Sequence, residues 1–134
     1  MPDRDPAHRV AELVREFHLA YGLPVADSPS ADLPGGEVAL RQDLIDEEVS
    51  ELREAAADAD LVGVADALAD IVYVAYGTAL VYGIDLDAVL DEVHASNMTK
   101  LGADGRPVRR ADGKVLKGPG YRPPNIAAVL SRES

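Results

Sequence analysis

A cluster of glutamates lies where an amphipathic helix would place apolar side chains or directly beside them. Residues 40–55 predict a helix, because apolar residues recur there at every third or fourth position. The apolar stripe is made of Leu40, Leu44, Ile45, Val49, Leu52 and Ala55. Glu48 and Glu51 fall within this stripe, and Glu47 lies on its flank. Since residues three apart share a helix face, Glu48 and Glu51 are expected to converge on one point.

Asp66 and Asp70 form a second acidic pair, one helical turn apart at the head of an almost wholly apolar segment. Burying unpaired carboxylates is costly, and the only basic residue on these two faces is Arg41. A divalent metal ion between two helices would supply the missing charge. The predicted metal ligands are Glu47, Glu48, Glu51, Asp66 and Asp70. Ligands that offer oxygen alone favour Mg²⁺, with Mn²⁺ as the second choice. A solvated charged surface is the alternative interpretation.

The end of the predicted fourth helix carries polar residues on its apolar face. Asn97 and Lys100 continue the face that begins at Leu86. A buried Asn must be hydrogen-bonded, so these side chains either reach a substrate or mark the point where the helix enters solvent. The tail beyond is basic, with Arg106, Arg109, Arg110, Lys114, Lys117 and Arg122. It is either a solubilising terminus or an ordered loop that brings cations to a phosphate chain; Tyr121 and several glycines favour order.

Charge is unevenly distributed along the chain. The net charge is −11; residues 1–97 hold five Lys/Arg and 21 Asp/Glu, a balance of −16, whereas residues 98–134 hold eight and three, a balance of +5. The acidic total argues against a nucleic-acid partner, whose binding requires phosphate neutralisation. There is no cysteine, so thiolate zinc sites are excluded. The start of the chain lacks a signal-peptide pattern, and the longest uncharged run, 71–84, is too short for a bilayer. A cytoplasmic protein without a membrane partner is expected.

Hydrophobic periodicity and caps predict an all-α fold, an antiparallel four-helix bundle. The predicted helices span 6–21, 36–58, 60–82 and 85–100, with Gly83 as a C-terminal cap and Asp85 as an N-terminal cap. Turn signals at 103–106 and 111–114 predict a hairpin or ordered loop, and a short helix is expected at 125–132. One domain is expected over 1–134, with its core in 6–100 and an irregular basic segment in 101–134. The third helix should be central and buried, and its all-round apolarity predicts an oligomer.

These motifs together resemble a known superfamily. The run Glu47-Glu48-x-x-Glu51, then Asp70 within the segment LADIVY, then Asn97-Met98-Thr99-Lys100, resembles the all-α nucleoside triphosphate pyrophosphohydrolases. These include MazG-like proteins, dimeric dUTPases and phosphoribosyl-ATP pyrophosphohydrolases. The tail segments 110–118 and 121–124 are similar to the MazG-like branch that includes a dUTP-hydrolysing member. The resemblance covers residues 38–126.

The resemblance implies Mg²⁺ bound by the E-E-x-x-E helix and by an E-x-x-D motif on the next helix. It implies cleavage of a nucleoside triphosphate between the α- and β-phosphates, in a dimer or tetramer. Carried over, Glu48, Glu51 and Asp70 bind metal, and Glu47 binds metal or orients the attacking water. One position departs from the pattern: Ala67 stands where the motif has Glu, and Asp66 is the carboxylate that could replace it.

The predicted function is therefore hydrolysis of a (deoxy)nucleoside triphosphate, with dUTP or a non-standard nucleotide as candidates. Glu47 is the predicted base, and the predicted substrate-binding residues are Asn97, Lys100, Arg110, Lys114, Lys117 and Tyr121. Homodimers or homotetramers are the expected assemblies. Three alternatives stay open: hydrolysis of phosphoribosyl-ATP, a nucleotide-binding regulatory bundle without turnover, and a purely structural dimerisation bundle.

Overall fold

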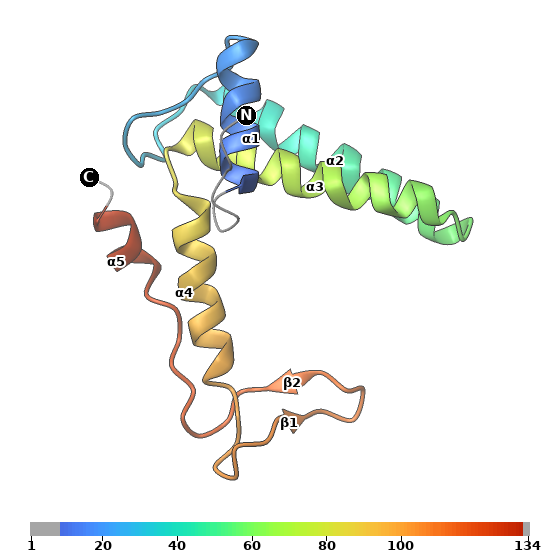
Figure 1. The fold of residues 1–134 in the computed structure, drawn as a ribbon, viewed down its shortest axis with the longest axis vertical. Helices are drawn as coiled ribbons and strands as arrows, with labels where there is room; N and C mark the ends of the chain where they lie inside the picture. The colour runs from blue at the N-terminus through green and yellow to red at the C-terminus, as the bar shows by residue number, and fades with distance from the viewer. Residues whose placement is uncertain (1–8, 133–134) are drawn as a thin grey trace. The chain divides into compact units, whose positions relative to one another are not determined.

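A computed structural model describes residues 9–132, most of which are helical (Figure 1). The elements are α1 (Arg9–Ala20), α2 (Gly35–Ala57), α3 (Leu61–Tyr82), α4 (Leu86–Met98), β1 (Val108–Arg109), β2 (Val115–Leu116) and α5 (Ile126–Ser131). The predicted all-α fold with four main helices is confirmed. Positions 6–8 of the first predicted helix lie outside the described residues. The chain forms two compact units that divide between Ile84 and Asp85, and each is described by itself.

The first unit is built on an antiparallel hairpin of α2 and α3, which lie side by side in Figure 1. Only residues 58–60 join the two helices. Asp60 begins α3 as its N-cap, since its carboxylate accepts a hydrogen bond from the backbone N–H of Gly63 at 3.0 Å. The short connection brings the acidic stretch of α2 back against the first half of α3.

α1 packs against the second half of α3. Val14 is fully buried, His18 is 2% exposed, and the Phe17 ring meets Tyr73 edge-on at 5.6 Å between centroids. The loop after α1 follows the end of α3 through backbone bonds from Ala26 to Leu80 and from Ser30 to Tyr82. These contacts fix the end of α3 from two directions.

Gly83 ends α3 in the left-handed conformation, with φ of 74°, as the cap prediction required. A Cβ at this position would collide with the carbonyl group of Ser28 in the loop. Glycine is therefore needed twice here, for its backbone angle and for its lack of a side chain.

Burial along α3 is uneven, so the expectation of a central, buried helix is wrong for residues 61–72. Leu61 and Val62 are 80% and 81% exposed, and Leu68 and Val72 are exposed as well. The reason is that α2 covers one side of this stretch, whereas α1 packs further along, near Tyr73. α3 is long and apolar enough to cross a membrane, but core helices of soluble proteins meet the same criteria of length and composition.

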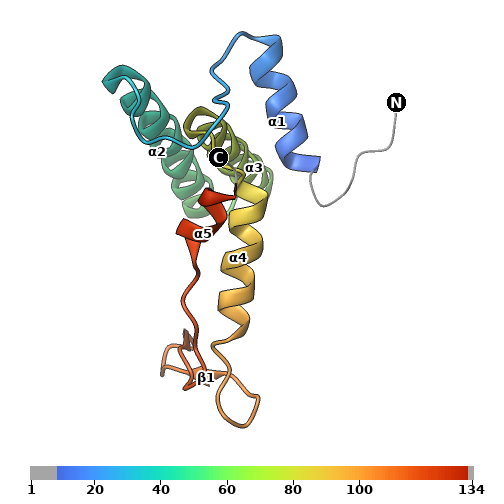
Figure 2. The ribbon, with the colours of Figure 1, turned by 90° about the vertical axis from the view of Figure 1, so that its left-hand side faces the viewer.

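The second unit consists of α4, the β1–β2 hairpin and α5, seen from two directions in Figures 1 and 2. Asp85 caps α4 by accepting from the Ala88 N–H at 3.2 Å, as predicted. The predicted hairpin is also confirmed: the strands are antiparallel, with Val108 opposite Leu116. α5 lies beside α4 in both views and buries Val129.

Candidate functional site

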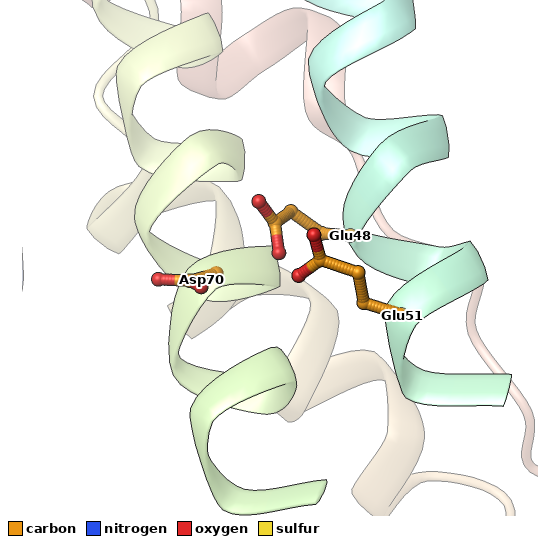
Figure 3. A group of neighbouring side chains, drawn as sticks. All are labelled: Glu48, Glu51 and Asp70. Atoms are coloured by element: carbon orange, nitrogen blue, oxygen red, sulfur yellow. The ribbon is translucent and has the colours of Figure 1, made fainter. Parts of the chain in front are cut away.

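Three carboxylates from two helices come together in the first unit. One oxygen each from Glu48, Glu51 and Asp70 all lie within 4.8 Å of one another. Figure 3 shows Glu48 and Glu51 reaching from α2 toward α3, with Asp70 on the facing turn of α3. The spacing of three along α2 puts both glutamates on the face that meets α3, and the antiparallel hairpin brings Asp70 opposite them.

The electrostatics of this cluster are unfavourable without a cation. Glu48 Oε2 is buried and has no hydrogen-bond partner among the described residues. Burial is the largest cause, followed by the neighbouring Glu51 carboxyl group and then by Asp70, and together they raise the pKa of Glu48 from 4.5 to about 7. A buried polar atom without a partner is rare in native proteins and calls for an explanation.

A hard divalent cation fits this cluster on the chemistry of its donors. Three carboxylates on two helices offer only oxygen, which suits Mg²⁺ or Mn²⁺ rather than a thiophilic metal. A cation would also give Glu48 Oε2 the partner that residues 9–132 do not supply. Glu48, Glu51 and Asp70 are therefore the residues that could hold it.

Glu47, the predicted base, lies outside the group of three. It is exposed and lines an open groove on α2, together with Asp43, Asp46, Ser50, Glu51 and Glu54. Glu51 belongs to both the groove and the cluster. Glu47 thus lies on the exposed surface of α2, in the groove that it shares with Glu51.

Asp66, the predicted substitute for the missing glutamate, is exposed and is not part of the group either. The neighbouring Ala67 is only 2% exposed. Since adjacent residues of a helix point about 100° apart, the inward position belongs to Ala67 and Asp66 points to the flank. The inward position at this turn of α3 therefore carries a methyl group instead of a carboxylate.

The predicted substrate-binding residues all lie in the second unit. Asn97 is exposed and Lys100 is half-buried. The Lys100 carbonyl accepts from the Gly118 N–H at 2.9 Å, and Lys117 Nζ lies 4.8 Å from the centre of the Tyr121 ring. The structure thus gathers Lys100, Lys117 and Tyr121 near the end of α4.

Arg110 and Lys114 lie apart from that group, at the turn of the hairpin. Arg110 pairs with Asp112, with Nε donating to Oδ1 at 3.0 Å, and this bond raises the pKa of Arg110 and lowers that of Asp112. The backbone of Lys114 donates to the same Asp112 carboxylate at 3.1 Å. Part of the basic charge of the tail is therefore already matched by Asp112.

Arg41 is the residue whose role the sequence left undefined. Its position marked it as a counter-charge for the acids, but it hydrogen-bonds Thr78 and the Val74 carbonyl on α3. Its spacing of seven residues from Glu48 places it on the same face of α2, which indicates a contact with α3 but does not identify the two acceptors.

A family match identifies the class of protein to which this fold and this carboxylate cluster belong, the all-α nucleotide pyrophosphohydrolases. The family model for phosphoribosyl-ATP pyrophosphohydrolase matches residues 14–97. The chain belongs to this family of pyrophosphohydrolase enzymes. The match includes every member of the cluster and ends at Asn97.

Two relatives are similar to the chain. It is 42% identical over 79 residues to an uncharacterised protein of Acanthamoeba polyphaga mimivirus; the match takes in 57% of this chain and 32%, about a third, of the viral protein. It is also similar to the crystal structure of a candidate NTP pyrophosphohydrolase from Exiguobacterium sp. 255-15, with 26% identity, coverage of 98% of this chain and 95% of the other, and a TM-score of 0.49.

Proposed function

We propose that this protein hydrolyses a nucleoside triphosphate between the α- and β-phosphates in a reaction that requires Mg²⁺ or Mn²⁺. The observation that supports the proposal most directly is the meeting of Glu48, Glu51 and Asp70 within 4.8 Å. The name of the family, phosphoribosyl-ATP pyrophosphohydrolase, includes a triphosphate-bearing nucleotide and the same class of reaction, which supports the proposal. A deoxynucleotide such as dUTP, or a non-standard nucleotide, is the proposed substrate.

In the proposed reaction Glu48, Glu51 and Asp70 hold the cation. When bound, the cation neutralises the phosphate oxygens and lowers the pKa of a coordinated water. Glu47, in the groove that it shares with Glu51, accepts the proton of the attacking water. The water oxygen bonds to the α-phosphorus, the bond from that phosphorus to the bridging oxygen breaks, and pyrophosphate leaves.

Substrate binding by residues of the second unit is a separate part of this proposal. Lys100 and Lys117 lie near one another at the end of α4, with Tyr121 beside Lys117. Their ammonium groups would bind phosphate oxygens, and Asn97 would hydrogen-bond the substrate. Arg110 is assigned a weaker part because Asp112 already offsets its charge, whereas the ammonium group of Lys114 keeps its proposed role in substrate binding.

A panel of ribo- and deoxynucleoside triphosphates with Mg²⁺ or Mn²⁺ tests the proposal, with monophosphate and pyrophosphate scored together. Equal amounts of the two products are expected, and Glu51→Gln should abolish turnover while keeping the fold. Release of orthophosphate would contradict the cleavage position. Phosphoribosyl-ATP belongs in the panel because the family model carries its name.

Ala67 favours one alternative, a protein that binds nucleotide without turning it over. The inward position at this turn lacks the carboxylate that the motif would place there. Tight Mg²⁺-dependent nucleotide binding with no product would support that alternative. Product formation that is lost in Asp70→Asn would exclude it.

A second copy of the chain is the partner in this proposal. Leu61, Val62, Leu68 and Val72 form an exposed apolar face on α3. Uncharged faces of this kind mark interaction surfaces in soluble proteins. A homodimer or homotetramer would cover it, in a cytoplasmic protein without nucleic-acid or membrane partners.

A further inference from the structure

Arg41 is a buried cation that the proposed chemistry does not use. The residue is only 7% exposed, and burial lowers the pKa of its guanidinium, an effect that the charge of Glu37 partly offsets. No ion pair of Arg41 occurs among the described residues. Burying a guanidinium without a carboxylate partner is costly, so its hydrogen bonds must serve a purpose in the fold.

The guanidinium links α2 to α3. Nε donates to Thr78 Oγ1 at 3.1 Å, and Nη2 donates to the Val74 carbonyl at 3.2 Å. The Thr78 hydroxyl itself donates to the same carbonyl at 2.8 Å. Two donors of Arg41 therefore bind one turn of α3, and a shift of α2 along α3 would break both hydrogen bonds.

Gly77 makes this close approach possible. A Cβ at position 77 would lie 2.7 Å from Arg41 Nη2 and 2.8 Å from His18 Nε2. The guanidinium of Arg41 from α2 and the imidazole of His18 from α1 therefore both lie against Gly77 of α3, which has no side chain. His18 is held in turn by Nδ1, which lies 2.9 Å from the Pro24 carbonyl.

This anchor occupies the same interface as the carboxylate cluster. Arg41 precedes Glu48 by seven residues, two turns of α2, or about 10 Å along the axis. Val74 and Thr78 follow Asp70 by one and two turns of α3. In an antiparallel pair the offset on α2 matches the offset on α3. The same alignment of the two helices therefore allows the Arg41 hydrogen bonds and brings Glu48 opposite Asp70.

We propose that Arg41 is a positioning residue that fixes the register of α2 on α3 through Thr78 and the Val74 carbonyl. In this role it holds Glu48 and Glu51 opposite Asp70 at a spacing that a divalent cation can bridge. The inference rests on the proposed function, because it presupposes that the cluster binds a metal. A purely structural role of Arg41 would affect stability alone, whereas a positioning role also predicts an effect on metal affinity.

The test measures Mn²⁺ binding to the full chain by electron paramagnetic resonance, without nucleotide. Arg41→Met keeps most of the side-chain length but removes the donors, and it should weaken Mn²⁺ binding roughly 2- to 30-fold, the range for coupling through packed networks. Arg41→Lys should recover part of the loss, since an ammonium can still donate to one acceptor. Arg53→Met, which removes an exposed arginine from the same helix, is the matched control and should bind as the unaltered protein does.

Thermal unfolding without metal, run in parallel, separates the outcomes. A folded Arg41→Met protein that binds Mn²⁺ as tightly as the unaltered protein would overturn the inference and leave the proposed function intact. An unaltered protein that binds no Mn²⁺ would overturn both. If Arg41→Met does not fold, Thr78→Val decides, because it removes the Nε acceptor at nearly constant volume; unchanged Mn²⁺ affinity in that variant would also refute the role.

Discussion

Replacing Glu48 by Gln should stabilise the metal-free protein at alkaline pH and remove its response to Mg²⁺. The pKa of Glu48 is about 7 in the folded state, against 4.5 ordinarily. Below pH 4.5 the carboxyl is protonated in both states and has no effect. As the pH rises to about 7 the unfolded chain ionises first, so the folded protein loses stability, and above this range the loss is complete. Gln carries no such penalty.

Mg²⁺ should have the opposite effect on the unaltered protein. At a concentration 100 times its dissociation constant, a ligand of the native state stabilises it by about 2.7 kcal/mol. For 134 residues, an unfolding entropy of about 2.1 cal/mol/K per residue converts this into a rise in Tm of about 10 °C. Glu48→Gln, which loses one of three charged donors, should show a small part of this rise.

Differential scanning calorimetry at pH 5 and pH 8, in EDTA and in a Mg²⁺ series, measures both effects. Glu54→Gln is the matched control, because Glu54 is an exposed acid of α2 outside the cluster and should leave the Mg²⁺ response unchanged. The reasoning fails if Glu48→Gln retains the full Mg²⁺ shift. It fails equally if its metal-free Tm shows the same decline between pH 5 and pH 8 as the unaltered protein.

Other expectations follow from the same structure. With a pKa of about 7, Glu48 is protonated in about half of the molecules at pH 7, so Mg²⁺ binding should release a fraction of a proton and tighten as the pH rises. Calorimetric titration in buffers of different ionisation enthalpy measures this proton release. A binding enthalpy that is independent of the buffer would contradict it. Glu in place of Leu68 or Val72 should disrupt the proposed oligomer, which sedimentation detects as a smaller species; a monomer before the substitution would remove the oligomer proposal. Gly83→Ala should lower the unfolding free energy by roughly 1–3 kcal/mol, because of its left-handed backbone and the collision with Ser28; unaltered urea denaturation would show that the loop can move aside.

The helices could be predicted from the sequence because their signals are local. Apolar periodicity located α2 and α3 to within a residue or two. Gly83 marked the end of α3 and Asp85 the start of α4, because such caps need only neighbouring backbone groups. The hairpin followed from turn residues in the same way, with Gly113 at a positive φ of 89°. Each of these features depends on a few consecutive residues.

Features that depend on packing between helices were harder to predict. Glu48, Glu51 and Asp70 meet as expected, since helix periodicity and one short turn determine their direction. Periodicity left the direction of Asp66 ambiguous, because it differs from Asp70 by only about 40° around the helix. The exposure of Leu61 depends on how far α1 extends along α3, which the sequence of α3 does not encode.

The three carboxylates lie within 23 consecutive residues, from Glu48 to Asp70. Chain closure over so short a span costs little entropy, and contacts of low sequence separation form early in folding. The proposed cation site and the α2–α3 hairpin can thus form as one local event, before distant parts of the polypeptide are in place. One short stretch of sequence, the α2–α3 hairpin, therefore supplies all three carboxylates of the cluster.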